Sequence, residues 1–144
     1  ACTREVLSIL KYVDFLKLSD EEIDMVGGHD NVLNIMKEYD IAAAVLTLGG
    51  GGAELFYDGQ SYVVPGYRVD HVADTTGAGD AFWGGFLACV LNQGVSSVDQ
   101  LNADILKYAV KYGNVSGSLS VREKGAIASL PTREKIEQFL SENQ

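Results

Sequence analysis

The chain has 144 residues, 47% of them hydrophobic, and its 20 acidic and 11 basic side chains give a formal net charge of −9. This length and composition are typical of one globular domain, so we expect residues 1–144 to fold as a single unit. The acidic balance argues against a nucleic-acid binder, which needs a cationic surface to contact phosphates. No run of about 18 apolar residues occurs, so the sequence predicts no membrane span. Cys2 and Cys89 stand in unrelated contexts, and the cytoplasm is the expected compartment.

The N-terminal segment begins with a helical pattern and continues into an extended one. Residues 3–11 carry apolar side chains at helical spacing, and residues 12–18 form a short apolar run that predicts a buried strand. Ser19, followed three residues later by Glu22, is the pattern of a capping box. We therefore expect a helix that starts there and ends near residues 27–28.

The next elements are a helix, a central strand and a hairpin. Residues 31–39 again show helical spacing, and residues 42–48 are continuously apolar, as expected of a strand covered on both faces. Residues 53–57 and 61–64 read as two short strands. They flank an Asp-Gly pair at residues 58–59, which is a strong signal for a two-residue hairpin turn.

The C-terminal half is predominantly helical. Residues 79–91 predict an apolar helix, and the glycine pair at residues 84–85 inside it is expected to allow close packing. Ser97 with Gln100 predicts the start of another helix, and a final helix is expected from Thr132. Helices and strands in this order predict an α/β layered fold.

A glycine-rich turn directly before the apolar helix forms the first candidate site. The glycines at Gly77 and Gly79, with Ala78 between them, allow successive N–H groups to converge at a helix N-terminus, which attracts an anion. Asp80 follows at once, and its carboxylate can take a proton from an attacking hydroxyl. In the alternative interpretation the glycines only shape a turn and Asp80 only stabilises the helix dipole.

A second glycine-rich segment follows the central strand, where ligands bind in open α/β sheets. It comprises Thr47, Leu48, Gly49, Gly50, Gly51 and Gly52. No Lys-Ser or Lys-Thr pair follows, so it is not a Walker A loop, and the hairpin after it excludes a dinucleotide-binding motif. Taken alone, the segment is better explained as an ordinary loop between a strand and a hairpin.

Histidine and aromatic side chains offer weaker signals. His29 and His71 have no neighbours at metal-ligand spacing, so the sequence predicts no zinc site. His29 is interpreted as a solvated loop residue. Phe82 and Trp83 are interpreted as core residues and not as a platform for a nucleotide base.

Residues 74–82, Asp-Thr-Thr-Gly-Ala-Gly-Asp-Ala-Phe, resemble the C-terminal signature of the ribokinase-like carbohydrate kinases, the PfkB family. Residues 12–22, 47–52, 124–126 and 130–131 resemble further segments of the family, in the family's order. The resemblance covers essentially the whole chain but only the second half of a family member. It implies the C-terminal portion of a three-layer, Rossmann-like α/β fold with a short β-hairpin after the central strand.

The resemblance also implies residue roles. Asp80 would be the general base, and Gly77, Ala78 and Gly79 would form the anion hole. ATP would contact the glycine-rich segment, Asn114 and Ser19, and Glu22 would be linked to magnesium. A monovalent cation, in the family usually potassium, would lie at Asp74, Thr76, Ser120, Glu123, Gly125 and Ser129. Two departures are present, since Ser19 replaces a frequent asparagine and the nucleotide loop consists of glycine alone, which implies weaker ATP binding.

The resemblance implies ATP-dependent phosphorylation of a sugar hydroxyl. Residues 17–22 and 82–87 look fructokinase-like, so fructose is the first expectation, with ribose, a nucleoside or a sugar phosphate as alternatives. A second hypothesis is a nucleotide- or anion-binding module without turnover. The family's N-terminal sugar-binding and lid portion has no counterpart here. The isolated chain is therefore expected to be inactive, and to form a homodimer or to associate with the missing portion.

Overall fold

The computed structural model describes residues 4–68, 72–73, 75, 77–122 and 131–143. The described helices and strands, with η for a 3-10 helix, are α1 (Arg4–Leu10), β1 (Phe15–Ser19), η1 (Ile23–Val26), η2 (His29–Asn31), α2 (Val32–Tyr39), β2 (Ala43–Thr47), η3 (Gly49–Gly51), β3 (Ala53–Tyr57), β4 (Gln60–Val64), α3 (Ala78–Asn92), η4 (Val98–Gln100), α4 (Ala103–Ser120) and α5 (Arg133–Glu142). The predicted strands and the main predicted helices are present, with bounds that differ by a few residues.

The strands form one mixed sheet in the order β1-β2-β3-β4. β1 and β2 are parallel, with Phe15 opposite Ala43, and β3 and β4 follow as antiparallel neighbours. The turn between β3 and β4 has φ of 49° at Asp58 and 74° at Gly59. Positive φ at both central residues is the geometry of the tight turn that an Asp-Gly pair favours, so the predicted hairpin is confirmed.

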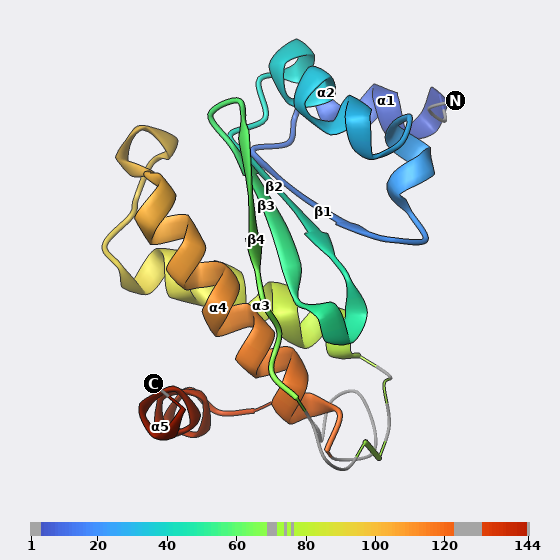
Figure 1. The fold of residues 1–144 in the computed structure, drawn as a ribbon. Helices are drawn as coiled ribbons and strands as arrows, with labels where there is room; N and C mark the ends of the chain where they lie inside the picture. Colours follow the sequence, from blue (N-terminus) through green and yellow to red (C-terminus); the bar gives the residue numbers. More distant parts are fainter. Residues whose placement is uncertain (1–3, 69–71, 74, 76, 123–130, 144) are drawn as a thin grey trace.

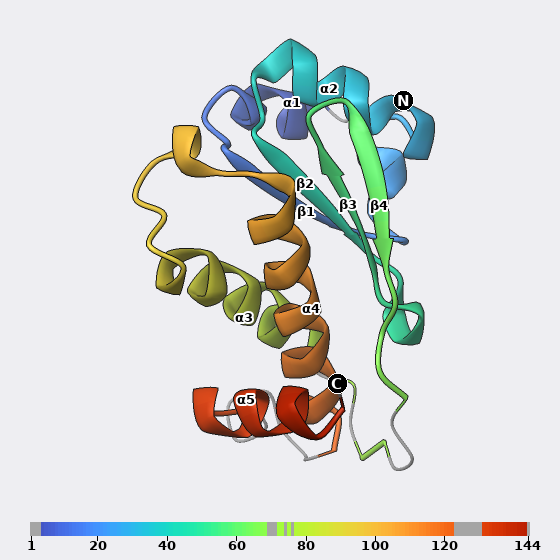
Figure 2. The ribbon, with the colours of Figure 1, turned by 60° about the vertical axis from the view of Figure 1, so that its left-hand side comes forward.

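Helices cover both faces of the sheet and give three layers, as Figures 1 and 2 show. The sequence of β2 explains why both faces are covered: successive side chains of a strand point to opposite faces of the sheet, and those of β2 are apolar on both. Ala43 and Val45 pack in the cluster with α3, α4 and α5. Ala44 and Leu46 pack in the other cluster, with α1 and α2. The continuous apolar run is therefore buried on both sides, as predicted, and the fold class is confirmed as α/β.

The helices α3 and α4 approach each other through small residues. A Cβ atom placed on Gly85 would lie 2.8 Å from the Ser116 Cβ, and one on Gly113 would lie 2.9 Å from the Phe82 carbonyl oxygen. The Ser116 hydroxyl donates a hydrogen bond of 2.7 Å to the Ala81 carbonyl across this contact. Gly84 is different, because a Cβ there would meet no atom within 4 Å. The predicted close packing thus holds for Gly85 and is wrong for Gly84, which faces outward.

The two neighbouring glycines predict opposite mutational effects. Gly85→Ala is expected to destabilise the fold by about 1–3 kcal/mol, because the added methyl group forces the two helices apart. Gly84→Ala is the matched control and is expected to stabilise it by roughly 0.5–1 kcal/mol through helix propensity. Urea unfolding of both variants measures the difference. Equal free energies of unfolding for the two variants would contradict this account of the interface.

The two predicted capping boxes open shorter helices than expected. The Ser19 amide donates to the Glu22 carboxylate at 2.9 Å, but the segment that follows is the 3-10 helix η1 and not an α-helix. It ends at Gly27 and Gly28, whose φ values of 93° and 92° interrupt a helix.

The second capping box, at Ser97 and Gln100, is present but caps only the three-residue helix η4. The long helix α4 begins one turn later. The side chain of Asn102 caps it by accepting a hydrogen bond of 2.9 Å from the Ile105 amide.

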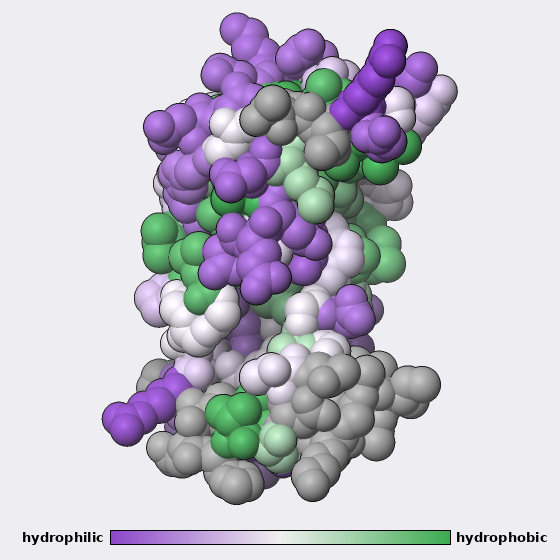
Figure 3. Space-filling model, turned by 90° about the vertical axis from the view of Figure 1, so that its right-hand side faces the viewer, coloured by the Kyte–Doolittle hydropathy of each residue, from purple (hydrophilic) through white to green (hydrophobic). Residues whose placement is uncertain are grey.

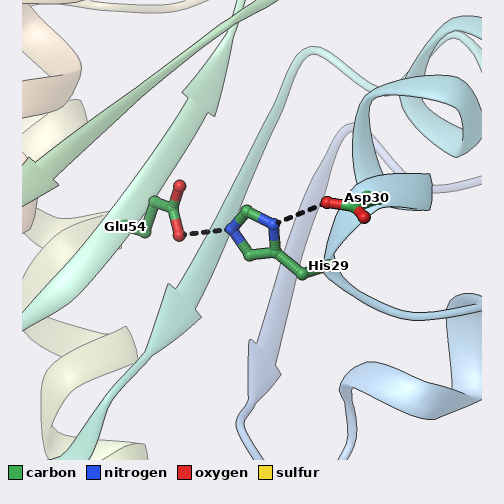
Figure 4. A network of polar contacts seen from close by, with 3 residues as sticks. All are labelled: His29, Asp30 and Glu54. Carbon is green, nitrogen blue, oxygen red and sulfur yellow. Dashed lines mark hydrogen bonds and ion pairs between the residues drawn. The ribbon is translucent and has the colours of Figure 1, made fainter.

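His29 joins the crossover between β1 and β2 to the sheet, as Figure 4 shows. Its Nε2 lies 2.7 Å from the Glu54 carboxylate, and its Nδ1 lies 3.5 Å from that of Asp30. The ring also packs edge-on against Phe56, with centroids 5.4 Å apart. Glu54 lies on β3 and only 9% of it is exposed, so the histidine supplies the partner that a buried carboxylate requires. His29 is solvent-exposed, as predicted, but the interpretation missed its contact with Glu54.

This contact predicts a pH-dependent contribution to stability. The hydrogen bond to Glu54 raises the pKa of His29 above 6.5. The protonated form is therefore favoured in the fold, and its contribution is complete below that value and lost as the pH rises through the raised pKa. Because the ring is half-exposed, we expect only about 0.2–1 kcal/mol.

The measurement compares urea unfolding of the wild type and His29→Gln at about pH 6 and about pH 9. The gap in unfolding free energy is expected to be larger at the lower pH. A gap that grows with pH would contradict the assigned sign.

The sheet ends in β1 on one side and β4 on the other within the described chain. Figure 3 faces the side that carries β1 and α1, and its apolar residues form separate patches between polar areas. Cys89 is a buried free thiol, and burial raises its pKa to about 11. None of the helices in the described ranges is long and apolar enough to cross a membrane.

Candidate nucleotide and phosphoryl-transfer site

A cavity of about 630 Å³ lies beyond the carboxyl end of β2. Four segments meet around it: the loop after β2, the chain leaving β4, the N-terminus of α3, and one face of α4. The lining residues are Thr47, Gly49, Gly50, Gly52, Gly66, Tyr67, Arg68, Val72, Thr75, Ala78, Gly79, Phe82, Asn114, Gly117, Ser118 and Val121. The two glycine-rich segments that the sequence marked as candidate sites thus lie on the same cavity.

The loop after β2 contains a turn of 3-10 helix, and the end of the β3–β4 hairpin packs against it. Thr47, Gly49, Gly50 and Gly52 line the cavity, whereas Leu48 and Gly51 do not. The Leu48 amide donates to the Gly52 carbonyl at 2.9 Å and closes the loop.

Gly52 has φ of 94°, and a Cβ there would lie 2.2 Å from the Val64 carbonyl oxygen and 2.4 Å from the Gly66 nitrogen. Glycine is therefore required at Gly52 by both conformation and space.

The N-terminus of α3 contributes Ala78 and Gly79 to the cavity wall. Gly77 is the N-cap with φ of 79°, and the helix begins at Ala78. Of the two glycines in this turn, only Gly77 has positive φ, and the helix begins at Ala78, one residue before the predicted start at residue 79. The amides of Gly79 and Asp80 stand in the first turn, where a helix offers no internal acceptor. Asp80 is exposed there, at the rim and not in the lining.

The face of α4 that closes the cavity has helical spacing, with Asn114, Gly117, Ser118 and Val121 at i, i+3, i+4 and i+7. Asn114 is buried, and its amide donates hydrogen bonds of 3.2 Å to the carbonyls of Val64 and Pro65. The sequence placed Asn114 at a nucleotide site, and it does line the cavity. Its N–H donors bond the chain that leaves β4, so Asn114 stabilises this wall of the cavity.

Ser19 is the last residue of β1, the strand next to β2, and Glu22 lies three residues further on; neither lines the cavity. The hydrogen bond from the Ser19 amide lowers the pKa of Glu22, burial opposes this, and the charge of Lys17 acts in the same direction as the hydrogen bond. Glu22 is therefore an ionised carboxylate near neutral pH. Lys17 was not singled out in the sequence, although it is the one charged side chain in the apolar strand Phe15–Ser19.

Most positions of the expected monovalent-cation site fall outside the described residues: Asp74, Thr76, Glu123, Gly125 and Ser129. Ser120 is described and buried, and its hydroxyl donates to the Gly117 carbonyl at 2.8 Å within its own helix. The Ala73 amide donates to the Val121 carbonyl at 2.7 Å, which joins the segment before α3 to the end of α4. Within the described ranges, no group of three or more His, Cys, Asp or Glu side chains is placed to hold a metal ion.

The fold and the cavity define a three-layer α/β protein whose cavity lies at the carboxyl edge of parallel strands, where such folds bind ligands. The sequence also matches the pfkB family carbohydrate kinases over residues 2–133. The chain therefore belongs to the pfkB family of carbohydrate kinases.

Fructokinases are among its relatives. Fructokinase-2 of Zea mays is 37% identical over 92% of this chain and 39% of its own length. The fructokinase of Escherichia coli is 34% identical over 94% of this chain and 43% of its own length. A double mutant of the fructokinase from Vibrio cholerae O395, solved with fructose, ADP and a potassium ion, is 31% identical and superposes with a TM-score of 0.81. That match covers 94% of this chain and 43% of the other, so the chain spans about two fifths of the length of these relatives.

Proposed function

We propose that this chain supplies the ATP site, the anion hole and the general base of a kinase that phosphorylates a sugar hydroxyl. One observation carries the proposal: a single cavity is lined jointly by the loop after β2, the N-terminus of α3 and the face of α4. Membership of the pfkB family supports the reaction class. The ADP and fructose bound by the Vibrio cholerae relative support a nucleotide and a sugar as ligands.

The nucleotide is proposed to lie along the cavity with its base between the chain leaving β4 and the wall that Asn114 holds in place. Its phosphates then point to Gly79, at the positive end of α3. Because catalysis of phosphoryl transfer is mostly positioning and charge stabilisation, the amides of Gly79 and Asp80 in this helix turn are proposed to act on the transferring group without rearranging. Gly49 and Gly50 lie along the same path, where backbone can approach a ligand closely.

Asp80 is proposed as the general base. It stands one residue beyond the cavity lining, exposed in the first turn of α3. The acceptor hydroxyl is proposed to bind between its carboxylate and the terminal phosphoryl group. The hydroxyl oxygen attacks the phosphorus, its proton passes to Asp80, and the bond to the bridging oxygen of ADP breaks.

We propose Glu22 as the carboxylate that would hold a magnesium ion, since magnesium is usually bound through one or two protein carboxylates together with substrate phosphates. Such an ion would supply neutralisation of the phosphate charge. A monovalent cation near Ser120 is proposed as well, in line with the potassium of the Vibrio cholerae relative.

The acceptor is proposed to be fructose, since fructokinases are prominent among the relatives. A binding module without turnover is the second candidate. The chain spans about two fifths of the length of these relatives, so turnover by the whole protein is part of the proposal. We propose that residues from a homodimer partner, or from the part of the relatives that this chain does not match, complete the sugar pocket.

The test is a coupled assay of ADP release, with fructose, ribose or adenosine as acceptor. It uses the full-length protein, which here means this chain joined to the part of the relatives that it does not match. The same assay is run on the 144-residue chain alone. Both proteins are assayed with potassium and with a bulky organic cation at equal ionic strength. Fructose-dependent ADP release that potassium stimulates supports the proposal in full. ATP binding without acceptor-dependent release from the full-length protein supports the module instead. The chain alone is expected to bind ATP weakly and to phosphorylate no sugar.

A further inference from the structure

Lys17 reaches from β1 to the N-terminus of α3. A Cβ placed on Gly79 would lie 3.3 Å from the Lys17 Nζ and 3.8 Å from its Cε, so the ammonium group lies directly beside this helix turn. Strand alternation explains the direction. Phe15, two residues earlier on the same face, packs edge-on against Phe86 of α3 with centroids 6.1 Å apart. The lysine is therefore held beside the proposed phosphate position by the strand itself.

The local electrostatics of this arrangement are unusual. The N-terminus of a helix carries a partial positive charge, so a cation beside it is unfavourable in the empty site. Across the described ranges, the Lys17 ammonium forms no ion pair or hydrogen bond, and the Glu22 carboxylate is the anionic group that senses its charge. Two positive groups that converge without a protein anion between them provide the field that a bound anion requires.

The proposed binding mode gives the two walls of the cavity different ligands. Asn114 belongs to the wall on α4, where the base is proposed to bind, whereas Gly79 belongs to the wall at the start of α3, where the phosphates are proposed to bind. In this binding mode a group beside Gly79 meets the terminal phosphate of the nucleotide and not its base. Lysine suits this task, because its ammonium is a compact point charge with three donors and rotates to follow the moving oxygens.

We propose that Lys17 binds the terminal phosphoryl group of the nucleotide and stabilises its charge during transfer. This inference rests on the proposed kinase function and adds a residue outside the glycine-rich signature to it. Lys17 keeps its proton throughout, while the acceptor oxygen–phosphorus bond forms and the bond to the leaving ADP oxygen breaks.

The test uses Lys17→Met, which keeps the length of the side chain and removes its charge, and Lys17→Arg, which keeps the charge. Lys37→Met, on the exposed surface of α2, controls for the loss of one positive charge. Calorimetric affinities for ATP and AMP are measured on the full-length protein, together with kcat for the acceptor sugar. Lys17→Met is expected to weaken ATP binding by about 10- to 100-fold and to leave AMP binding within about twofold of wild type.

The kcat of Lys17→Met is expected to fall by about 10²-fold, as for the loss of one donor to developing charge, and Lys17→Arg is expected to recover part of the loss. The melting temperature should not fall, because the removed cation opposes the helix dipole in the empty site. ATP binding and turnover within about twofold of wild type would overturn the inference. An equal loss of AMP and ATP affinity, or a lowered melting temperature, would assign Lys17 a structural role and overturn it as well. Absence of ATP binding in the wild type would overturn the proposed kinase function itself.

Discussion

Asp80→Asn is expected to lower sugar-dependent turnover by about 10²- to 10⁴-fold while ATP affinity stays largely intact. The amide cannot accept the proton of the acceptor hydroxyl, yet it has nearly the size of the carboxylate. Asp80 is exposed at the rim of the cavity and does not line it, so the fold and the nucleotide contacts should survive the change. The measurement is kcat for the sugar together with a calorimetric titration of ATP, both on the full-length protein.

Asp104→Asn is a matched control for the alternative interpretation, in which Asp80 has no catalytic role and only stabilises the dipole of its helix. Asp104 is also an exposed aspartate in the first turn of a long helix, α4. Both substitutions remove a helix-dipole interaction worth about 0.3–1 kcal/mol, so both should lower the melting temperature slightly. Only Asp80→Asn should lower turnover. If its kcat stays within about threefold of wild type, Asp80 is not the base.

The sequence predicted those parts of the fold that depend on local patterns. The apolar run at β2, the Asp-Gly turn between β3 and β4 and the helix after Gly77 are each specified by a few adjacent residues. Their positions agree with the structure to within about two residues at each end. Both glycine-rich segments that the sequence offered as candidate sites contribute residues to one cavity, since one follows β2 and the other begins α3.

The parts that the sequence did not predict depend on contacts between distant residues. His29 and Glu54 are 25 positions apart, and no local pattern of charge or spacing links them. Asn114 donates to carbonyls 49 and 50 positions away, and no local pattern in the sequence links these residues. Lys17 meets Gly79 only because β1 lies under the start of α3.

Glycine shows the same limit at single-residue level. Gly84 and Gly85 are adjacent and chemically identical, but only Gly85 faces the neighbouring helix. Helical periodicity alone does not decide which of the two meets α4, because the apolar residues of α3 surround the helix on more than one side. The four glycines after β2 are equivalent in the sequence for a similar reason, and their different roles follow from where β4 leaves the sheet.

Gly52→Ala is expected to have the second large effect, because it strains the loop after β2 and pushes it away from the hairpin. At φ of 94° and ψ of −136° the residue has a conformation that essentially only glycine adopts. The new methyl group would also lie 2.2 Å from the Val64 carbonyl oxygen, which is backbone and has little room to move. Together, the strain and the overpacking should cost roughly 2–5 kcal/mol of folding stability.

Gly50→Ala is the matched control in the same loop, because a Cβ there would meet no protein atom within 4 Å and its φ is not in the left-handed region. It is expected to stabilise the fold by roughly 0.4–1 kcal/mol, because alanine lowers the conformational entropy of the unfolded chain. Urea unfolding of both variants, followed by titration of Gly52→Ala with ATP, separates the effects. Because Gly52 and Gly66 both line the cavity, the displaced loop should also weaken ATP binding. A Gly52→Ala variant as stable as Gly50→Ala, with unchanged ATP affinity, would show that the loop does not need the hairpin contact to shape the nucleotide site.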